Sequence, residues 1–507
     1  MQPVRVRFAP SPTGALHIGG VRTALYNYLL AKKTNGTMIL RIEDTDQTRF
    51  VPGAEEYIMK SLEWVGIKID EGVLQGGPHA PYRQSERKSI YKQYAQKLID
   101  EGNAYYAFDT EEELEAMRNR LKATGSSNQQ YSSTTRMMMN NSLTLPEAEV
   151  KRKLASGDAY VIRLKIPDAE EIALTDLIRG EVKVHSEQID DKVLMKSDGM
   201  PTYHLANVVD DYLMQITHVI RGEEWLPSAP LHVLLYRFLG WEKQMPQFAH
   251  LPLLLKPDGN GKLSKRDADK AGFPLFPYNW IDPTSGELSK GFQESGYLPD
   301  ALINFLAFLG WNPGTEQEIF SMSELVSEFT VERIGKAGAR FDIQKAQWFN
   351  QQYLKAKSNN ELAEFLMALL PAGSCTKEKA AKICGLLKER VTFTHDFATQ
   401  AKFFFEAPSE YDQQVVSKKW NNDAVTVLTA YSQALASIQE LTAEVAKATL
   451  ENVTATLGIG LGKIMQALRV SITGAGSGPD LMIAMEILGS SEVVSRINRA
   501  LSTLKKV

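Results

Sequence analysis

The first 85 residues alternate between strand and helix patterns, and this alternation restricts the fold more than any other feature of the chain. In VRVRF, residues 4–8, apolar side chains alternate with arginine, which predicts a strand. PSPTG then supplies turn residues before a helical stretch from about 16 to 33. TMILRIEDTD predicts a buried strand, and VPGAEEYIMKSLEWVG a second helix. This βαβα order predicts a parallel doubly wound sheet, in which ligands bind at the carboxyl ends of the strands.

Later segments of the chain have other patterns. Between about 86 and 200 the alternation stops, and YVIRLKIP, ALTDLIRGEVKV and KVLMKSDGMPTYHLANVVDD predict strands of a separate mixed sheet. We interpret the polar and Met-rich stretch near 124–142 as a mobile loop. Beyond about 341 helical spacing dominates. The expected domains are therefore a nucleotide-binding domain (1–85 and 201–255), an insertion (86–200), a loop-bearing region (256–340) and an all-helical region (341–507).

Composition limits the class of protein. The 507 residues are 43% hydrophobic and 23% charged, which is typical of globular domains. The net charge of −4, taken alone, argues against a nucleic-acid binder. Two cysteines are too few for a four-cysteine zinc site or a disulfide framework. The N-terminus does not have the apolar core of a signal peptide, and no apolar run reaches membrane-spanning length. We expect a cytoplasmic protein without a membrane anchor.

RFAPSPTGALHIGG, residues 7–20, is the first candidate site. Gly19 and Gly20 at the predicted helix start would let the backbone approach a nucleotide. His17 would then face phosphate, where a donor stabilises the negative charge that develops during displacement. The alternative is an ordinary turn with His17 as a capping or core residue.

KLSKR, residues 262–266, is the second candidate and lies in a loop rich in Gly, Asp and Lys. Lysine carries a compact charge on a flexible stem, which suits contact with a moving pyrophosphate. A basic loop can equally be a solvated surface. The order of the two motifs is more informative than either alone, because KLSKR follows about 245 residues after HIGG.

Together these motifs resemble the two signature sequences of class I aminoacyl-tRNA synthetases. PSPTG, RIEDTD, PYRQSER, PTYHLANVVDD, VIRGEEW and LGKIMQALRVSITGAGSGP make the chain closely similar to the bacterial glutamyl-tRNA synthetases. The resemblance implies an α/β fold: a Rossmann-like catalytic domain, an inserted α+β domain that binds the tRNA acceptor end, a stem-contact region with the KLSKR loop, and an all-α anticodon-binding region. It also implies an enzyme that activates L-glutamate with ATP and Mg²⁺ and transfers it to the 3′-terminal adenosine of tRNA(Glu). We expect the protein to be a monomer.

The resemblance also assigns residues to a glutamate site, which needs a cation for the side-chain carboxylate and an acceptor for the ammonium group. The matching positions are Arg7, Ser11, Glu43, Tyr203, Asn207 and Arg221. We assign Arg221 to the side-chain carboxylate, Glu43 to the ammonium, and Arg7, Tyr203 and Asn207 to orientation. Alternatively, Arg221 pairs with Glu223 or Glu224, and Glu43 is an ordinary charge at a strand end.

The implied ATP site consists of His17, Gly19, Gly20, Glu224, Trp225, Leu254 and Lys265, with His17, Lys262 and Lys265 as the catalytic residues. Trp225 could equally be a core residue. The last position of the first signature is Gly20 rather than histidine, which places more weight on the two lysines. Some relatives carry zinc in the insertion, but residues 86–200 contain no cysteine and only His185. We therefore predict no protein-bound metal and no structural zinc.

RNA contacts are expected from local basic strips. Residues 83–97 and 151–165 each carry five basic side chains and one acidic one, and residues 373–405 carry six and three. By resemblance these strips meet the acceptor end and the anticodon, and Arg390 would read the last anticodon base. Two alternatives to a specific glutamate–tRNA ligase are a non-discriminating enzyme that also charges tRNA(Gln) and a catalytically inactive tRNA-binding paralogue.

Because the basic side chains are grouped on a chain of net negative charge, binding should be specific for tRNA and sensitive to salt. Fluorescence titrations at increasing salt should show tRNA affinity falling steeply, with weak binding of unrelated duplex DNA throughout. Equal affinity for any polyanion would contradict this expectation.

Overall fold

The computed structural model describes residues 3–125 and 129–504. The chain divides into two compact units. The first comprises Met1–Ser295 and Leu302–Ile343, and the second comprises Gly296–Ala301 and Gln344–Val507.

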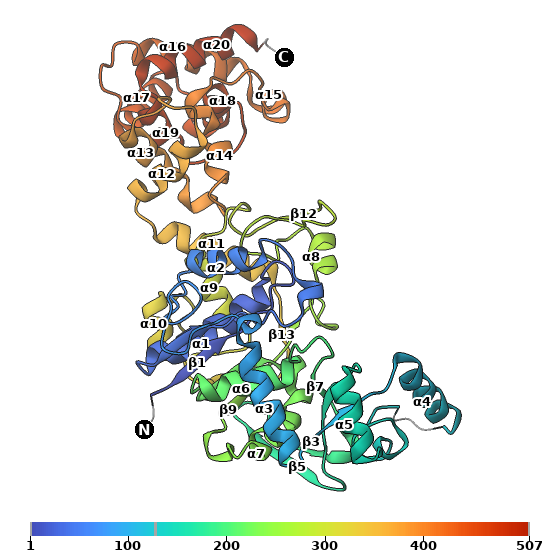
Figure 1. Cartoon of the computed structure of the whole chain (residues 1–507). Helices are drawn as coiled ribbons and strands as arrows, with labels where there is room; N and C mark the ends of the chain where they lie inside the picture. Colours follow the sequence, from blue (N-terminus) through green and yellow to red (C-terminus); the bar gives the residue numbers. More distant parts are fainter. Residues whose placement is uncertain (1–2, 126–128, 505–507) are drawn as a thin grey trace. The chain divides into compact units, whose positions relative to one another are not determined.

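A six-stranded sheet forms the centre of the first unit (Figure 1). Its order is β2 (Thr37–Leu40), β1 (Arg5–Phe8), β8 (His218–Gly222), β9 (Gln247–Leu251), β5 (Glu171–Asp176) and β6 (Gly180–His185). All neighbouring strands pair in parallel except β5 and β6. The predicted α/β fold with a largely parallel sheet is confirmed.

Strand alternation separates the two faces of this sheet. Val6 and Ile220 are buried beside helix α1 (Ile18–Lys33), which packs against β1, β2 and β8. Val219 and Phe248 belong to the core that includes α3 (Lys88–Asp100), α6 (Tyr203–Leu213) and α7 (Ala229–Phe238). Arg7 shares this second face, because it pairs with Asp211 on α6. Arg7 is therefore directed at a helix instead of at water, whereas Arg5 pairs with Glu71 outside the helices.

The hairpin of β5 and β6 differs from the sequence prediction, which placed both strands in a separate inserted sheet. Asp176 of β5 instead aligns with Phe248 of β9, so the hairpin extends the central sheet. The insertion keeps its own antiparallel sheet of β3 (Ala104–Ala107), β4 (Val161–Leu164) and β7 (Val193–Met195). Alternating burial along β5 fits either sheet, so only the tertiary fold selects the partner strand.

Residues 203–213 were also predicted within strands but form α6. Their apolar positions 205, 206, 208 and 209 are all buried, which is helical spacing. Only seven residues separate β7 from α6, so the apolar positions of the two elements can be mistaken for one continuous strand pattern. As a consequence, α6 carries Tyr203, Asn207 and Asp211 on turns that follow one another.

The segment near 124–142, interpreted above as a mobile loop, lies partly outside the described residues. Its described part is packed: Tyr131, Ser132 and Asn141 are buried, and Asn141 donates to the backbone carbonyl of Arg136 at 2.7 Å. Arg136 is 4% exposed, lies 3.2 Å from the Asp191 carboxylate and donates to the Ile166 carbonyl. Buried hydrogen bonds therefore fix residues whose polar composition is typical of a loop.

The other elements of the first unit surround the sheet. The α-helices are α2 (Ala54–Trp64), α4 (Glu111–Ala123), α5 (Glu147–Ser156), α8 (Lys265–Ala271), α9 (Pro299–Ala307, which continues from the second unit) and α10 (Met322–Glu328). Short strands are β10 (Leu254–Leu255), β11 (Trp280–Ile281), β12 (Leu288–Ser289) and β13 (Ala339–Arg340). The 3₁₀ helices are η1 (Gln47–Arg49), η2 (Gln84–Arg87), η3 (Arg136–Met138), η4 (Ser186–Gln188), η5 (Glu223–Ser228), η6 (Glu242–Gln244) and η7 (Val331–Arg333).

The second unit is helical, as predicted. Its elements are α11 (Ile343–Ala356), α12 (Asn359–Leu369), α13 (Lys377–Leu387), η8 (Lys388–Arg390), α14 (Asp396–Phe405), α15 (Gln413–Lys419), α16 (Asn422–Leu435), α17 (Ala443–Thr456), α18 (Leu461–Thr473), α19 (Leu481–Leu488) and α20 (Ser490–Thr503). Two apolar clusters fill it, and Cys384 is buried in one of them. Cys375 lies just before α13 and is partly exposed.

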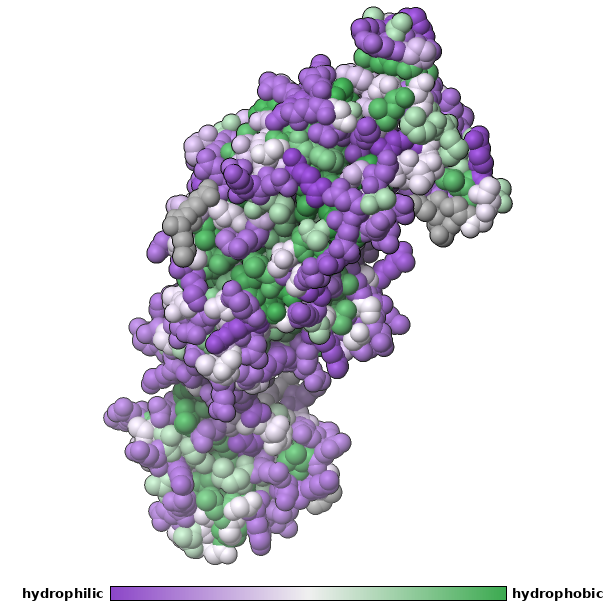
Figure 2. Space-filling model, turned by 90° about the horizontal axis from the view of Figure 1, so that it is seen from below, coloured by the Kyte–Doolittle hydropathy of each residue, from purple (hydrophilic) through white to green (hydrophobic). Residues whose placement is uncertain are grey.

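Hydrophilic residues cover most of the face shown in Figure 2, with groups of hydrophobic residues between them. Among residues 3–125 and 129–504, no helix combines the length and the apolar character needed to cross a bilayer.

The pair of Arg136 and Asp191 yields a stability prediction. Arg136→Met keeps the side-chain volume but leaves a buried carboxylate without its cation, and it should destabilise the insertion by about 3 kcal/mol. Hydrogen exchange of the β4 and β7 amides measures this local effect. The matched control is Arg152→Met, because Arg152 is 63% exposed and lies 3.9 Å from Glu149; its effect should stay within about 0.5 kcal/mol. Equal protection in both variants would show that the pair does not stabilise the insertion.

Candidate active site

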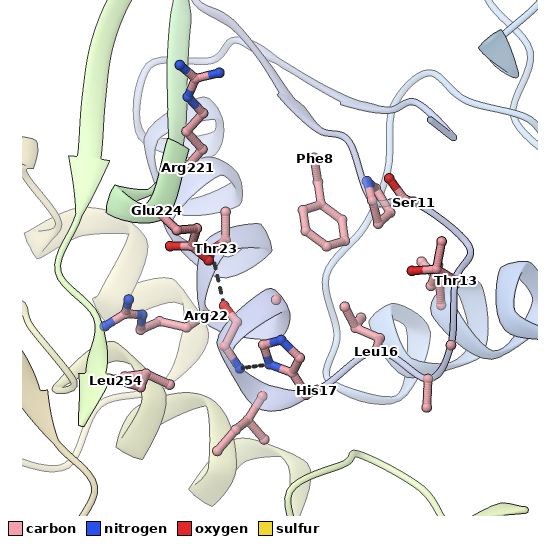
Figure 3. A pocket seen from close by; sticks show the side chains of 18 of the residues that line it. Phe8, Ser11, Thr13, Leu16, His17, Arg22, Thr23, Arg221, Glu224 and Leu254 are labelled. Atoms are coloured by element: carbon pink, nitrogen blue, oxygen red, sulfur yellow. Dashed lines mark hydrogen bonds between the residues drawn. The ribbon is translucent and has the colours of Figure 1, made fainter. Parts of the chain in front are cut away.

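A cavity of about 690 Å³ opens at the carboxyl ends of β1 and β8. It is lined by every residue predicted for the glutamate and ATP sites: Arg7, Ser11, His17, Gly19, Gly20, Glu43, Tyr203, Asn207, Arg221, Glu224, Trp225, Leu254, Lys262 and Lys265. Figure 3 shows Ser11 and Thr13 on the loop after β1, on the opposite side of the view from Glu224 and Leu254. Segments far apart in the sequence thus meet where a parallel sheet binds its ligands.

His17 is the N-cap of α1 and also faces the cavity (Figure 3). Its Nδ1 accepts a hydrogen bond from the Gly19 backbone N–H at 3.0 Å, so the proton of the neutral ring is on Nε2. His17 is exposed to the open cavity, but desolvation by the protein atoms around it, together with the positive charge of Lys262, lowers its pKa. His17 is therefore a helix-capping residue, as the alternative interpretation held. Because Nδ1 accepts the capping bond, Nε2 carries the proton and can donate to a ligand in the cavity.

Gly19 and Gly20 lie close to neighbouring side chains. A Cβ on Gly19 would lie 2.7 Å from the His17 ring, and one on Gly20 would overlap the end of the Leu16 side chain. A larger residue at position 19 would therefore displace the imidazole, whereas one at position 20 would require the Leu16 side chain to move. The sequence prediction gave a different reason for these glycines, namely close approach of the backbone to a nucleotide.

Arg7 and Glu43 belong to one buried ionic network. Arg7 donates from Nε and Nη2 to the two carboxylate oxygens of Asp211 at 3.0 and 3.2 Å. Arg41, fully buried, lies 2.8 Å from Asp211 and donates to Glu43 at 3.0 Å. Asn207 donates to the same Glu43 oxygen at 2.8 Å. Glu43 is thus more than an ordinary charge at a strand end.

The network also fixes the charges of its carboxyl groups. Burial raises the pKa of Glu43, although Arg41 and Arg7 oppose that effect. Burial also acts on Asp211, but there the two arginines dominate and hold the pKa below its usual value. The cavity wall therefore carries a strongly held anion in Asp211 and a carboxyl in Glu43 that a cationic ligand would help to ionise.

Arg221 is 5% exposed and is held by neutral groups. It donates to His250 Nε2 at 3.0 Å, to the Tyr203 hydroxyl at 2.6 Å and to the Trp225 carbonyl at 3.3 Å. The alternative in which it pairs with a neighbouring glutamate does not fit. Glu223 pairs with Arg179, and Glu224 lies 3.2 Å from Lys262.

Trp225 is 41% exposed, so it is not a core residue. Its ring lies over Tyr203, with 4.4 Å between centroids and 34° between planes. Leu254 is 8% exposed and lines the same cavity. Trp225 therefore contacts a residue predicted for glutamate, although the sequence prediction placed it against adenine.

The KLSKR segment spans the start of α8. Ser264 is the N-cap and forms a reciprocal capping box with Asp267. Lys265 lies 2.7 Å from Glu287, and both side chains are partly exposed. These accessible ion pairs are weak enough for a polyphosphate to displace them. Lys262 and Lys265 both line the cavity, which favours ligand contact over a purely solvated surface.

The sequence prediction missed several residues that hold the site: Arg22, Arg41, Asp176, Asp211 and His250. Arg22 is 3% exposed and donates to the carbonyls of Leu309 (2.7 Å) and Pro252 (2.5 Å). Asp211 is the last residue of the motif PTYHLANVVDD. A charged residue next to an apolar helical segment could have indicated a buried ion pair. Asp176 carried a similar signal, because it shares the alternating buried face of β5 with Ile172 and Leu174. No comparable signal marked His250.

Arg390 does not line the cavity. It is exposed in η8 of the second unit, where its carbonyl accepts from the Gln400 amide at 3.3 Å.

Comparison with known proteins agrees with this geometry. Residues 3–348 match the family model of class I tRNA synthetases (E and Q), catalytic domain, and residues 360–501 match an anticodon binding domain. A glutamate–tRNA ligase of Cytophaga hutchinsonii is 64% identical over 99% of this chain and 98% of its own. One from Amoebophilus asiaticus is 56% identical over 100% and 99%. The chain belongs to the glutamate–tRNA ligases.

Solved structures of the family have the same fold. A crystal structure of a glutamate tRNA ligase from Elizabethkingia meningosepticum, in complex with its amino acid, has a TM-score of 0.96 and 51% identity, covering 99% of this chain and 100% of its own. Membership of class I implies use of ATP. Among the described residues, no group of three or more His, Cys, Asp or Glu side chains could hold a metal ion.

The capping bond of His17 yields a prediction about protonation. Because the folded-state pKa lies below the ordinary 6.5, the folded state binds fewer protons than the unfolded chain. This contribution to stability is therefore present above pH 6.5 and is lost as the pH falls. Ring ¹⁵N NMR, assigned with His17→Gln, should show a neutral Nε2–H tautomer at pH 7 and a midpoint below 6.5. A doubly protonated ring at pH 7 would contradict the capping geometry.

Proposed function

We propose that the chain is a discriminating glutamate–tRNA ligase that acts through the cavity residues described above. The α-carboxylate of L-glutamate attacks the α-phosphorus of ATP, forming glutamyl-adenylate and releasing pyrophosphate. The 3′-terminal ribose hydroxyl of tRNA(Glu) then attacks the adenylate carbonyl, and AMP leaves. The observation that carries the proposal is that Arg7, Arg221, His17 and Lys265 line one cavity. The two arginines are suited to bind carboxylates, and the histidine and lysine are suited to bind phosphates.

The glutamate subsite has complementary groups for each charge of the substrate. Arg221 would bind the side-chain carboxylate, with Tyr203 beside it as a second donor. Glu43 would accept from the ammonium group. Among the described residues Asn207 Oδ1 has no hydrogen-bond partner although it is buried, so it offers a further acceptor. Arg7, held by Asp211, would orient the α-carboxylate, and Ser11 lines the same region of the cavity.

The ATP subsite would use the other wall. His17 Nε2–H would donate to the phosphates, and Lys262 and Lys265 would leave Glu224 and Glu287 to stabilise the charge on the departing pyrophosphate. Glu224, Trp225 and Leu254 would enclose the adenine end, with Gly19 and Gly20 beside it. Mg²⁺ would be held chiefly by the phosphates and water, which suits a cavity with few carboxylates.

Discrimination against glutamine would come from Arg221. A neutral amide would leave a 5%-exposed guanidinium without an anion, a loss of roughly 2–5 kcal/mol. Such a penalty is about 30- to several-thousand-fold, so one binding step suffices without editing. We further propose that the insertion binds the acceptor end, that Arg390 reads an anticodon base, and that the protein acts as a monomer in the cytoplasm.

ATP–pyrophosphate exchange tests the function directly. We expect exchange with glutamate only when tRNA(Glu) is present, and little with glutamine. Absence of exchange with any amino acid and tRNA would favour an inactive tRNA-binding paralogue. Efficient glutamylation of a tRNA(Gln) transcript would instead establish a non-discriminating enzyme.

Lys265→Ala should slow adenylate formation about 100-fold, because it removes a charge that acts chiefly in the transition state. The tRNA dissociation constant should change little. Single-turnover kinetics and filter binding measure the two effects. The control is Lys270→Ala on the same helix, an exposed lysine outside the cavity. Equal losses of chemistry and tRNA binding would make the loop a contact to the tRNA backbone.

A further inference from the structure

Three neighbouring strands bring Arg221, His250 and Asp176 together. Arg221 of β8 and His250 of β9 are register partners. Asp176 ends β5, where it aligns with Phe248, two residues before His250. In strands, residues two apart share a face, so the three side chains lie on the same side of the sheet. Their exposed fractions are 5%, 0% and 1%.

The three side chains form a directed chain of hydrogen bonds. Asp176 Oδ2 lies 2.6 Å from His250 Nδ1, and His250 Nε2 accepts from Arg221 Nε at 3.0 Å. Since the guanidinium can only donate, Nε2 must be unprotonated and the ring proton must be on Nδ1. Burial lowers the pKa of His250, which keeps the ring neutral. Asp176 therefore determines which ring nitrogen accepts from Arg221.

This arrangement also determines which part of Arg221 faces a ligand. Nε is occupied by His250, and the terminal nitrogens donate to Tyr203 and to the Trp225 carbonyl. A guanidinium has five N–H groups, so these contacts leave one on each terminal nitrogen. The Phe248 ring lies 5.7 Å from the guanidinium carbon and restricts its tilt. Two N–H groups in a fixed orientation match a carboxylate better than an amide.

We propose that Asp176 and His250 are positioning residues that set the selectivity of Arg221 for a carboxylate over an amide side chain. The inference rests on the proposed role of Arg221 in glutamate binding. Because His250 holds Nε without adding a negative charge, the guanidinium keeps its full attraction for the substrate carboxylate. An aspartate in contact with Arg221 would hold it equally well but would neutralise that charge. The imidazole thus transmits orientation from Asp176 and keeps the two charges apart.

His250 is the better residue to test. Asp176 also accepts from the backbone N–H groups of Ile178 and Arg179, so it supports the turn after β5. His250→Leu removes the acceptor at similar volume, whereas the amide oxygen of His250→Gln can still accept from Arg221 Nε. Asp176→Asn is the second probe, because its amide N–H would face Nδ1 and move the ring proton to Nε2. A proton on His250 Nε2 would face the Nε–H of Arg221, so that hydrogen bond would be lost.

The experiment measures steady-state aminoacylation of tRNA(Glu) with glutamate and glutamine. His250→Leu should raise KM for glutamate roughly 10- to 100-fold and lower the glutamate-to-glutamine ratio of kcat/KM, with KM for ATP nearly unchanged. His250→Gln should stay within about threefold of wild type for KM. Asp176→Asn should shift KM in the same direction as His250→Leu. The control is His218→Leu, on β8 outside the cavity, which should leave these ratios unchanged.

A purely structural role would give a different pattern. If His250→Leu and His250→Gln lose kcat equally while KM for glutamate stays constant, the proposal is overturned. If His250→Leu does not fold, an unchanged KM for glutamate in Asp176→Asn overturns it. Arg221→Met tests the role of Arg221 separately from the function of the whole protein. Unchanged glutamate KM in that variant would refute the role of Arg221 itself, whereas failure of wild type to charge glutamate would refute the proposed function.

Discussion

Asp211 accepts hydrogen bonds from two buried arginines, and the geometry of the cavity depends on this shared carboxylate. Arg7 on β1 and Arg41 just after β2 would otherwise be two buried positive charges near each other without a shared anion. Asp210 extends the same network through Arg87 at 2.7 Å and the Tyr91 hydroxyl at 2.8 Å. Adjacent acidic residues on α6 thus connect two strands and α3. Removing either carboxylate would leave unpaired cations in the core.

The cavity combines a rigid wall with a displaceable one. The residues proposed to bind glutamate are held by buried groups: Arg221 by His250, Arg7 by Asp211, and Glu43 by Arg41. Lysines of the KLSKR segment contact only partly exposed carboxylates. This difference fits the chemistry, because selection of an amino acid requires fixed donors, whereas departure of pyrophosphate requires charges that can move with it.

Net charge is a poor guide to partners here. Several acidic residues of the first unit, among them Asp176, Asp191, Asp210 and Asp211, are buried against arginine or histidine. The buried arginines offset these buried carboxylates, so the total of −4 comes from residues nearer the surface. A total charge does not show how the charges are distributed over that surface, and a negative total is therefore compatible with local basic strips.

Local sequence determined most of the elements and the residues that line the cavity. Alternation in VRVRF, turn residues in PSPTG and helical spacing beyond 341 predicted strands and helices correctly, because these patterns depend on neighbours a few residues away. The HIGG and KLSKR motifs likewise indicated the residues that line the cavity. Only the tertiary structure decided that β5 joins the central sheet, that α6 is a helix, and that His250 and Asp176 lie behind Arg221. These outcomes depend on strand register and on pairing between charges up to 204 positions apart, as for Arg7 and Asp211, and a local pattern carries no information about such distances.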